Sequence, residues 1–164
     1  MILVTVGGQL PFDRLIRCVD AWAGRAGGVE LFAQIGGGEY TPQHMRFERF
    51  LAPARFRDLA TGAEAIVAHA GVGTILTALE LQKPLLVFPR RAEHREHRND
   101  HQLGTARYFG ARGHVQVAFT EAELLERLPR LREQRPGARP APTSPELIAR
   151  LRAYAFGVSA SLPE

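Results

Sequence analysis

The stretch AIVAHAGVGTILTALELQKPLLVFPR, residues 65 to 90, decides the fold. Its first segment is an apolar run that ends at Ala68 and leads into His69 and a turn in which two glycines bracket a valine. The segment GTILTALELQ predicts a helix that ends before Pro84, and PLLVFPR predicts a second strand. A strand, a helix and a strand in this order are the right-handed unit from which parallel sheets are built.

The same alternation continues on both sides of this stretch. Further strands are predicted in MILVTVGG, VELFAQIGGG, MRFERFL and HVQVAF, and further helices over 11–28, 53–62, 99–113 and 121–134. Thr120 and Glu123 form a capping box at the start of the helix over 121–134. We therefore expect an α/β fold: a Rossmann-like parallel sheet with helices on both faces.

Length and composition fit one domain without disulfides. The chain has 164 residues, which favours a single domain, predicted over 1–156. It includes a proline-rich linker (135–145) and a last helix from Ser144 to about Tyr154, and a loose tail over 157–164 follows it. The one cysteine, Cys18, fits a reducing compartment. The apolar runs are too short to span a bilayer and no signal-peptide pattern is evident, so we expect a soluble cytoplasmic protein.

The charge balance does not indicate nucleic-acid binding. The net charge is +4 and nearly all basic residues are arginine, a bias that a GC-rich genome also produces. The arginines are scattered, whereas nucleic-acid binders usually cluster basic residues with aromatic ones. The denser segment over 130–139 is either a solvated face or a contact with a partner or anionic lipid.

The turn HAGVGT, residues 69 to 74, is a candidate anion site. A strand that leads through glycines into a helix points backbone N–H groups at one place, where the helix dipole also favours negative charge. Gly71 and Gly73 allow close approach of the backbone, Thr74 is able to cap the helix or bond a phosphate oxygen, and His69 adds a donor. The alternative is a tight turn with a buried core histidine.

The segment RRAEHREHRNDHQ, residues 90 to 102, follows the next strand and is therefore expected beside this turn. It is rich in groups that recognise hydroxyls, so the two segments together predict a nucleotide-sugar site. The alternatives are a solvated charged loop and a metal site formed by His94, His97 and His101. Arg95 and Arg98 would repel a dication, so we expect no metal and no cofactor.

The stretch from Ile66 to Val115, together with ILVTVGGQLPFDRLI near the N-terminus, resembles the donor-binding half of GT-B glycosyltransferases. The similarity, of the family 28 C-terminal-domain type, covers about residues 1–118. It is strongest to small single-half members. These are the PssE-type bacterial polysaccharide-synthesis subunits and the catalytic subunit of the eukaryotic two-subunit dolichol-linked N-acetylglucosaminyltransferase.

The resemblance implies specific roles. Gly7 and Gly8 face the interdomain cleft and the diphosphate. The diphosphate is held by the residues of the glycine turn, namely His69, Gly71, Gly73 and Thr74. Asn99, His101 and Gln102 lie in the sugar-binding segment. The broader superfamily has a ribose-binding glutamate where this chain has Thr77, and Glu80 one turn further on is a candidate substitute.

The resemblance also implies a missing half. A complete GT-B enzyme has two such domains, so we expect a membrane-attached partner that carries the acceptor domain. The expected reaction is transfer of a hexose from a UDP-sugar to a polyprenyl-diphosphate-linked saccharide in exopolysaccharide or cell-surface glycan synthesis. His69 would be catalytic, and the chain would lie at the inner face of the cytoplasmic membrane through its partner.

One alternative to this function stays open. The chain is either an active transferase subunit or a non-catalytic nucleotide-sugar-binding or scaffolding subunit that completes its partner. An ordinary dinucleotide-binding domain is disfavoured, because neither VGGQLP nor HAGVGT gives the pattern G-x-G-x-x-G and no acidic residue ends the second strand.

Overall fold

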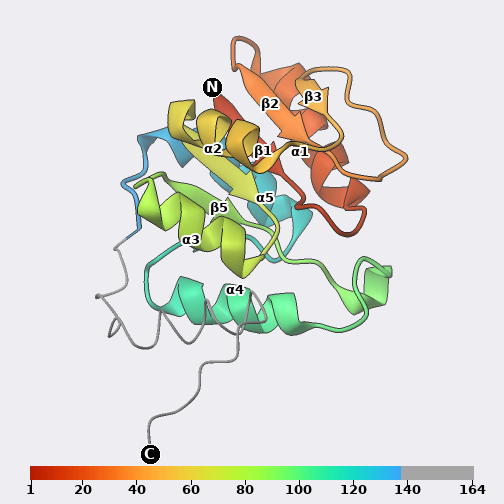
Figure 1. Cartoon of the computed structure of the whole chain (residues 1–164), viewed down its shortest axis with the longest axis vertical. Coiled ribbons are helices and arrows are strands. Elements are labelled where there is room, and N and C mark those ends of the chain that lie inside the picture. Colours follow the sequence, from red (N-terminus) through yellow and green to blue (C-terminus); the bar gives the residue numbers. More distant parts are fainter. Residues whose placement is uncertain (138–164) are drawn as a thin grey trace, which may run out of the picture.

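The computed structural model describes residues 1–137, which form one six-stranded parallel sheet with the strand order β3-β2-β1-β4-β5-β6 (Figure 1). All neighbouring strands are paired in parallel. The strands are β1 (Ile2–Thr5), β2 (Leu31–Gln34), β3 (Arg46–Glu48), β4 (Ala65–Ala68), β5 (Leu85–Val87) and β6 (Gln116–Val117). The predicted Rossmann-like α/β sheet is thereby confirmed.

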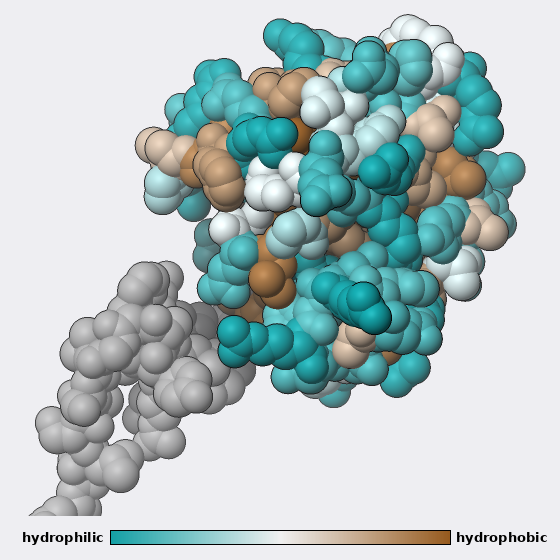
Figure 2. All heavy atoms as spheres, turned by 90° about the vertical axis from the view of Figure 1, so that its right-hand side faces the viewer, coloured by the Kyte–Doolittle hydropathy of each residue, from teal (hydrophilic) through white to brown (hydrophobic). Residues whose placement is uncertain are grey.

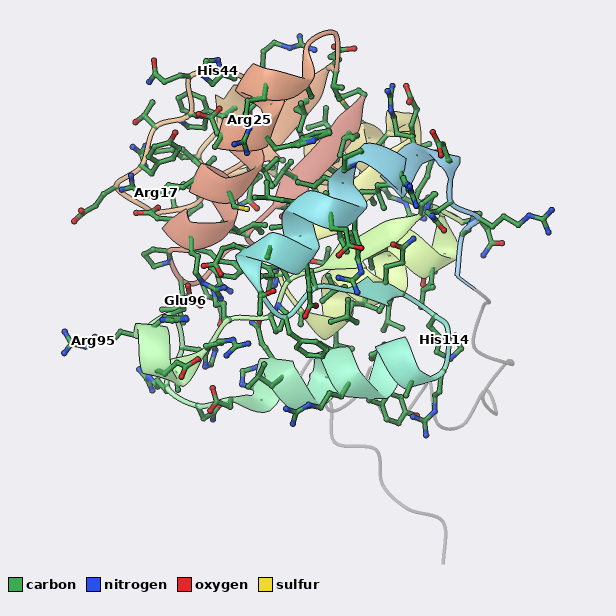
Figure 3. All side chains as sticks on the ribbon, turned by 180° about the vertical axis from the view of Figure 1, so that it is seen from behind. Arg17, Arg25, His44, Arg95, Glu96 and His114 are labelled. Atoms are coloured by element: carbon green, nitrogen blue, oxygen red, sulfur yellow. The ribbon has the colours of Figure 1, made fainter. Side chains whose placement is uncertain are left out.

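Helices cover both faces of this sheet. The α-helices are α1 (Asp13–Ala26), α2 (Pro53–Gly62), α3 (Val72–Glu80), α4 (His101–Ala111) and α5 (Glu121–Arg127), and the 3₁₀ turns are η1 (Ala92–His94) and η2 (Leu128–Glu133). Helices α2 and α3 lie in front of the sheet in Figure 1, whereas α1 and α5 lie in front of it when the molecule is seen from behind in Figure 3.

Alternation along the strands builds a core on each face. Ile2 and Val4 of β1 belong to the cluster with α1 and α5, whereas Leu3 between them belongs to the cluster with α2, α3 and α4. Successive side chains of a strand point to opposite faces. Each central strand is therefore buried on both sides, which explains its nearly continuous apolar sequence.

Two predicted details of the helices are wrong. The predicted helix over 121–134 ends as an α-helix at Arg127 and continues as the 3₁₀ turn η2. Pro129 explains this, because it has no N–H to continue the α-helical ladder. Thr74 does not cap α3, since that helix begins at Val72 with Gly71 as its N-cap.

The predicted capping box at Thr120 is confirmed on the Thr120 side, because the Thr120 hydroxyl accepts a hydrogen bond from the N–H of Glu123. The Glu123 carboxylate accepts a hydrogen bond from the N–H of Phe119 and not from that of Thr120.

Several predictions concern residues beyond those described. The boundary at residue 156, the helix over 144–154, the tail over 157–164 and most of the proline-rich linker lie outside residues 1–137. Within 1–137, no helix combines the length and the apolar character that crossing a bilayer requires.

Candidate functional site

The strand order changes direction between β1 and β4. Connections after β1 run toward β3, and those after β4 run toward β6. In open parallel sheets, ligands bind at such a switch point, outside the carboxyl ends of the strands. In this chain that position is lined by the loop that starts at Gly7 after β1 and by His69 and the glycine turn after β4. The side of the molecule with the loops after β2 and β5 is mostly hydrophilic (Figure 2).

The imidazole of His69 lies between two glycines. A Cβ atom placed on Gly7 would come within 2.6 Å of Cε1 of His69, and one on Gly71 within 2.2 Å of Nε2. Gly7 also has φ = +76°, a conformation that side chains disfavour. The glycines around His69 therefore have a steric explanation: the ring occupies the space where their side chains would be.

His69 is a buried, neutral residue. Its exposed fraction is 9%, and its Nδ1 is fully buried without a hydrogen-bond partner among the described residues. Burial, with a smaller contribution from the charge of Arg90, lowers the pKa of His69 to about 4. At neutral pH the ring is therefore able to donate one hydrogen bond, but it carries no positive charge.

The first turn of α3 leaves backbone donors without hydrogen-bond partners within residues 1–137. The N-cap Gly71 has an extended backbone and makes no side-chain cap hydrogen bond. The N–H groups at the first helical positions, Val72, Gly73 and Thr74, have no acceptor within the helix. A Cβ on Gly73 would meet nothing within 4 Å, so this residue faces open space. The turn is thus free to bind an anion.

Gln102 joins the two predicted segments. It is 3% exposed, and its Oε1 accepts hydrogen bonds of 3.1 Å from the N–H groups of both Ala70 and Arg90. The side chain therefore fixes the ends of β4 and β5 relative to each other. The predicted proximity of the glycine turn and the segment after β5 is observed, whereas the predicted contact of Gln102 with a sugar stays a prediction, with Nε2 as the atom left for it.

A nearly buried ion pair anchors the segment after β5. Nε and Nη2 of Arg14 donate to the two carboxylate oxygens of Glu96 at 2.6 and 2.8 Å, and the N–H of Arg91 donates to the same carboxylate at 2.9 Å. Figure 3 shows Glu96 beside α1, whereas Arg95 extends outward. Between this segment and the start of α1 lies an open hollow of about 380 Å³.

The other predicted site residues differ in position. His101 and Asn99 are exposed at the start of α4, with Nδ1 of His101 2.5 Å from Oδ1 of Asn99. Thr77 donates to the carbonyl of Gly73 within α3. Glu80 is the last residue of α3, about 12 Å along the axis from Val72, and lies 3.9 Å from Arg57. Gly8 is exposed in the loop after β1. The roles of these residues in ligand binding stay predictions.

Sequence reasoning missed Thr5 and Gln34, two polar residues that shape the site, and the buried contacts of Arg90, which it placed only in the polar segment over 90–102. Thr5 donates to Gln34 (2.6 Å), and Nε2 of Gln34 donates to the carbonyl of Gly7 (2.9 Å), so this pair holds the loop after β1. Arg90, 3% exposed, donates through Nη2 to the carbonyls of Val6 (2.7 Å) and Leu10. The available signal was polarity: each residue interrupts or ends an otherwise apolar run.

The described residues contain no cluster of three or more histidine, cysteine or acidic side chains arranged to hold a metal. His97 and His101 pack edge to face with ring centroids 4.4 Å apart, and His94 does not join them in such a cluster. The expectation that no metal or cofactor is needed stays a prediction.

Comparison with known families and proteins identifies the family of the chain. The glycosyltransferase family 28 C-terminal domain matches residues 1–151. The chain belongs to this family. It is 34% identical over 124 residues to the human UDP-N-acetylglucosamine transferase subunit ALG13, a match that covers 70% of the chain and 10% of the human protein. The corresponding protein of Eremothecium gossypii is 44% identical over 67 residues, 41% of the chain and 31% of that protein.

Solved structures show the same fold. The NMR structure of ALG13 superposes with a TM-score of 0.59 at 22% identity, covering 92% of this chain and 94% of that one. The glycosyltransferase of kitacinnamycin superposes with a TM-score of 0.61 at 18% identity, covering 96% of this chain but 38% of that one. This family 28 domain is therefore one Rossmann-like half of a GT-B fold, and it spans a small part of the human and fungal relatives.

Proposed function

We propose that this family 28 domain is the donor-binding subunit of a UDP-sugar-dependent hexosyltransferase. The single observation that carries the proposal is the arrangement at the switch point. There, the unpartnered N–H groups of α3 and the buried His69 lie beside the segment that Gln102 joins to them. Backbone donors at a helix N-terminus suit a diphosphate, and the polar segment over 91–102 suits a hexose.

The proposed reaction is a direct displacement at the anomeric carbon. An acceptor hydroxyl attacks this carbon, its proton passes to a base, and the bond to the diphosphate oxygen breaks so that UDP leaves. The N–H groups of α3 and the neutral donor of His69 stabilise the negative charge that grows on the leaving diphosphate. His69 itself is a weak base at this site, because its pKa is lowered to about 4.

The base and the acceptor site are therefore assigned to a second subunit. We propose a membrane-attached partner that carries the acceptor domain and a polyprenyl-diphosphate-linked saccharide as acceptor, in exopolysaccharide or cell-surface glycan synthesis. The family supports this proposal, because the relatives are named as subunits of a transferase and the chain supplies one half of a GT-B fold.

The proposal is tested first by mapping UDP onto the chain by NMR. UDP is expected to shift the amide resonances of Gly7, the glycine turn and the start of α4, and NAD is expected to shift none of them. A UDP footprint elsewhere, or none, contradicts the proposal.

The catalytic role of His69 is tested in the reconstituted two-subunit complex. His69→Ala is expected to lower kcat by about 10²–10³, the effect of losing one positioned donor, with a smaller effect on assembly. Retention of wild-type kcat by this variant would refute the role and favour the alternative of a non-catalytic binding subunit.

A further inference from the structure

Arg90 is a buried cation without a carboxylate partner. Its exposed fraction is 3%, and the only acceptors it reaches among the described residues are the carbonyls of Val6 and Leu10, both through Nη2. Its Nε is fully buried without a partner. Burial lowers the pKa of Arg90 only to about 10, so the side chain stays charged at neutral pH. Carbonyl groups solvate this charge, the ring centroid of Phe12 lies 5.1 Å from its Cζ, and the charge of Glu96 attracts it from beyond ion-pair distance, but no described carboxylate is in direct contact with it.

Such an arrangement is costly in a folded protein. Buried charges are normally paired with an opposite charge, because desolvation of an ion costs several kcal/mol. The neighbouring arginines show the usual solution: Arg14 lies 2.6 Å from Glu96, and Arg91 lies 2.7 Å from Glu93. For Arg90 no carboxylate lies within ion-pair distance in the described chain, which suggests that its counter-charge comes from a ligand.

The position of Arg90 identifies which ligand group. Its N–H shares the Gln102 acceptor with Ala70, the residue after His69. Its guanidinium bonds the carbonyl of Val6, the residue before Gly7, and Gly7 packs against the His69 ring. The charge therefore lies at the switch point between the loop after β1 and the glycine turn, and it is close enough to contribute to the lowered pKa of His69.

We propose that Arg90 is the fixed positive charge of the donor site, and that the diphosphate of the nucleotide-sugar supplies its counter-charge. This inference rests on the proposed function. Arg90 is also a positioning residue, since its two carbonyl hydrogen bonds hold the loop over residues 6–10 against the site. It provides the charge that the neutral His69 cannot provide.

The gain in binding affinity with each added phosphate group distinguishes the role of Arg90 as a charge for the diphosphate from its role in positioning the loop. The full chain, alone and with its partner, is titrated with uridine, UMP and UDP. Wild type is expected to bind UDP more tightly than uridine. Arg90→Gln is expected to reduce the UDP-to-uridine affinity ratio by about tenfold, the effect of one nearby charge, while uridine binding changes little. Arg90→Lys, which keeps the charge, is expected to recover most of the ratio.

Arg91→Gln is the matched control, because Arg91 is adjacent in the chain but pairs with Glu93 and donates to the carbonyl of Phe119. It is expected to leave the ratio unchanged. If Arg90→Gln does not fold, the Nε–H resonance of Arg90 in the wild-type chain gives the answer, since it is expected to shift with UDP and not with uridine.

The outcomes distinguish the two proposals. A wild-type chain that does not prefer UDP over uridine refutes the proposed function, and this inference with it. If wild type shows the preference, the inference alone is refuted when Arg90→Gln keeps the full UDP-to-uridine affinity ratio, whether or not the variant binds both ligands more weakly.

Discussion

At the scale of single residues, the two glycines of the turn after β4 are required for different reasons. Gly71 is required by the apo protein itself, because a Cβ there would overlap the ring of His69. Gly73 has open space around its Cα and lies in the first turn of α3, where the folded chain gains nothing from glycine. Its absence of a side chain leaves room for a diphosphate to approach the N–H groups of the turn from outside.

Gly73→Ala consequently has opposite expected effects on stability and on binding. The free energy of unfolding is expected to rise by about 0.5–1 kcal/mol, since alanine loses less backbone entropy than glycine in a helix. The UDP affinity is expected to fall at least about tenfold, because the methyl group keeps the diphosphate away from the N–H groups. Denaturant unfolding and calorimetric titration of the same preparation measure both.

Gly104→Ala is the control for this pair of effects. Gly104 lies inside α4, and a Cβ there also meets nothing within 4 Å. It is expected to stabilise the chain similarly without changing UDP affinity. Unchanged UDP affinity in Gly73→Ala would show that the turn is only a structural connection.

At the scale of secondary-structure elements, the carboxylate of Glu96 ties the segment over 91–100 to helix α1. Glu96 accepts from Arg14 on α1 and from the N–H of Arg91, and its side chain is 9% exposed. Glu96→Gln removes the charge and keeps the shape. We expect amide hydrogen exchange over 91–100 to accelerate about tenfold while the rest of the sheet is unaffected, because a mostly buried charge-assisted pair is lost.

Glu93→Gln is the matched comparison, since Glu93 lies in the same segment but is 62% exposed and pairs with Arg91 at the surface. Exposed pairs contribute little, so exchange over 91–100 is expected to stay as in wild type. Equal acceleration in both variants would mean that the segment is held by charge in general and not by the contact between Glu96 and Arg14.

The same elements show how much the sequence predicts. Strands and helices were recognisable because the central strands are buried on both faces and read as apolar runs, and glycines or prolines mark their ends. The contacts of Gln102 and Arg90 were not predictable. The Oε1 of Gln102 accepts hydrogen bonds from the N–H groups of Ala70 and Arg90. The guanidinium of Arg90 donates to the carbonyl of Val6, 84 residues away in the sequence. Such long-range pairing depends on strand order, which periodicity does not encode.

At the scale of the whole molecule, His69 connects the site to the pH dependence of folding. The pKa of His69 is lowered to about 4 in the folded chain, mainly by burial, from an unfolded value of 6.5. Between these values the unfolded state binds more protons than the folded state, so stability rises with pH in this window. The contribution of neutral His69 is complete above about pH 6.5 and is lost as the pH falls toward 4.

Denaturant unfolding at pH 7 and pH 5 measures this contribution. Wild type is expected to lose about 2 kcal/mol more than His69→Gln over this interval, because glutamine does not titrate. The absolute stability of His69→Gln also changes, since the ring leaves the space between Gly7 and Gly71, so the informative quantity is the slope with pH. His97→Gln is the control: the pKa of His97 is also lowered, by burial and by His101, but its side chain is only partly buried, so removing it is expected to change the slope less than removing His69 does. If the stability of wild type and of His69→Gln changed equally with pH, the ring of His69 would be accessible to protons in the folded chain. The close packing of this ring between Gly7 and Gly71 would then be wrong.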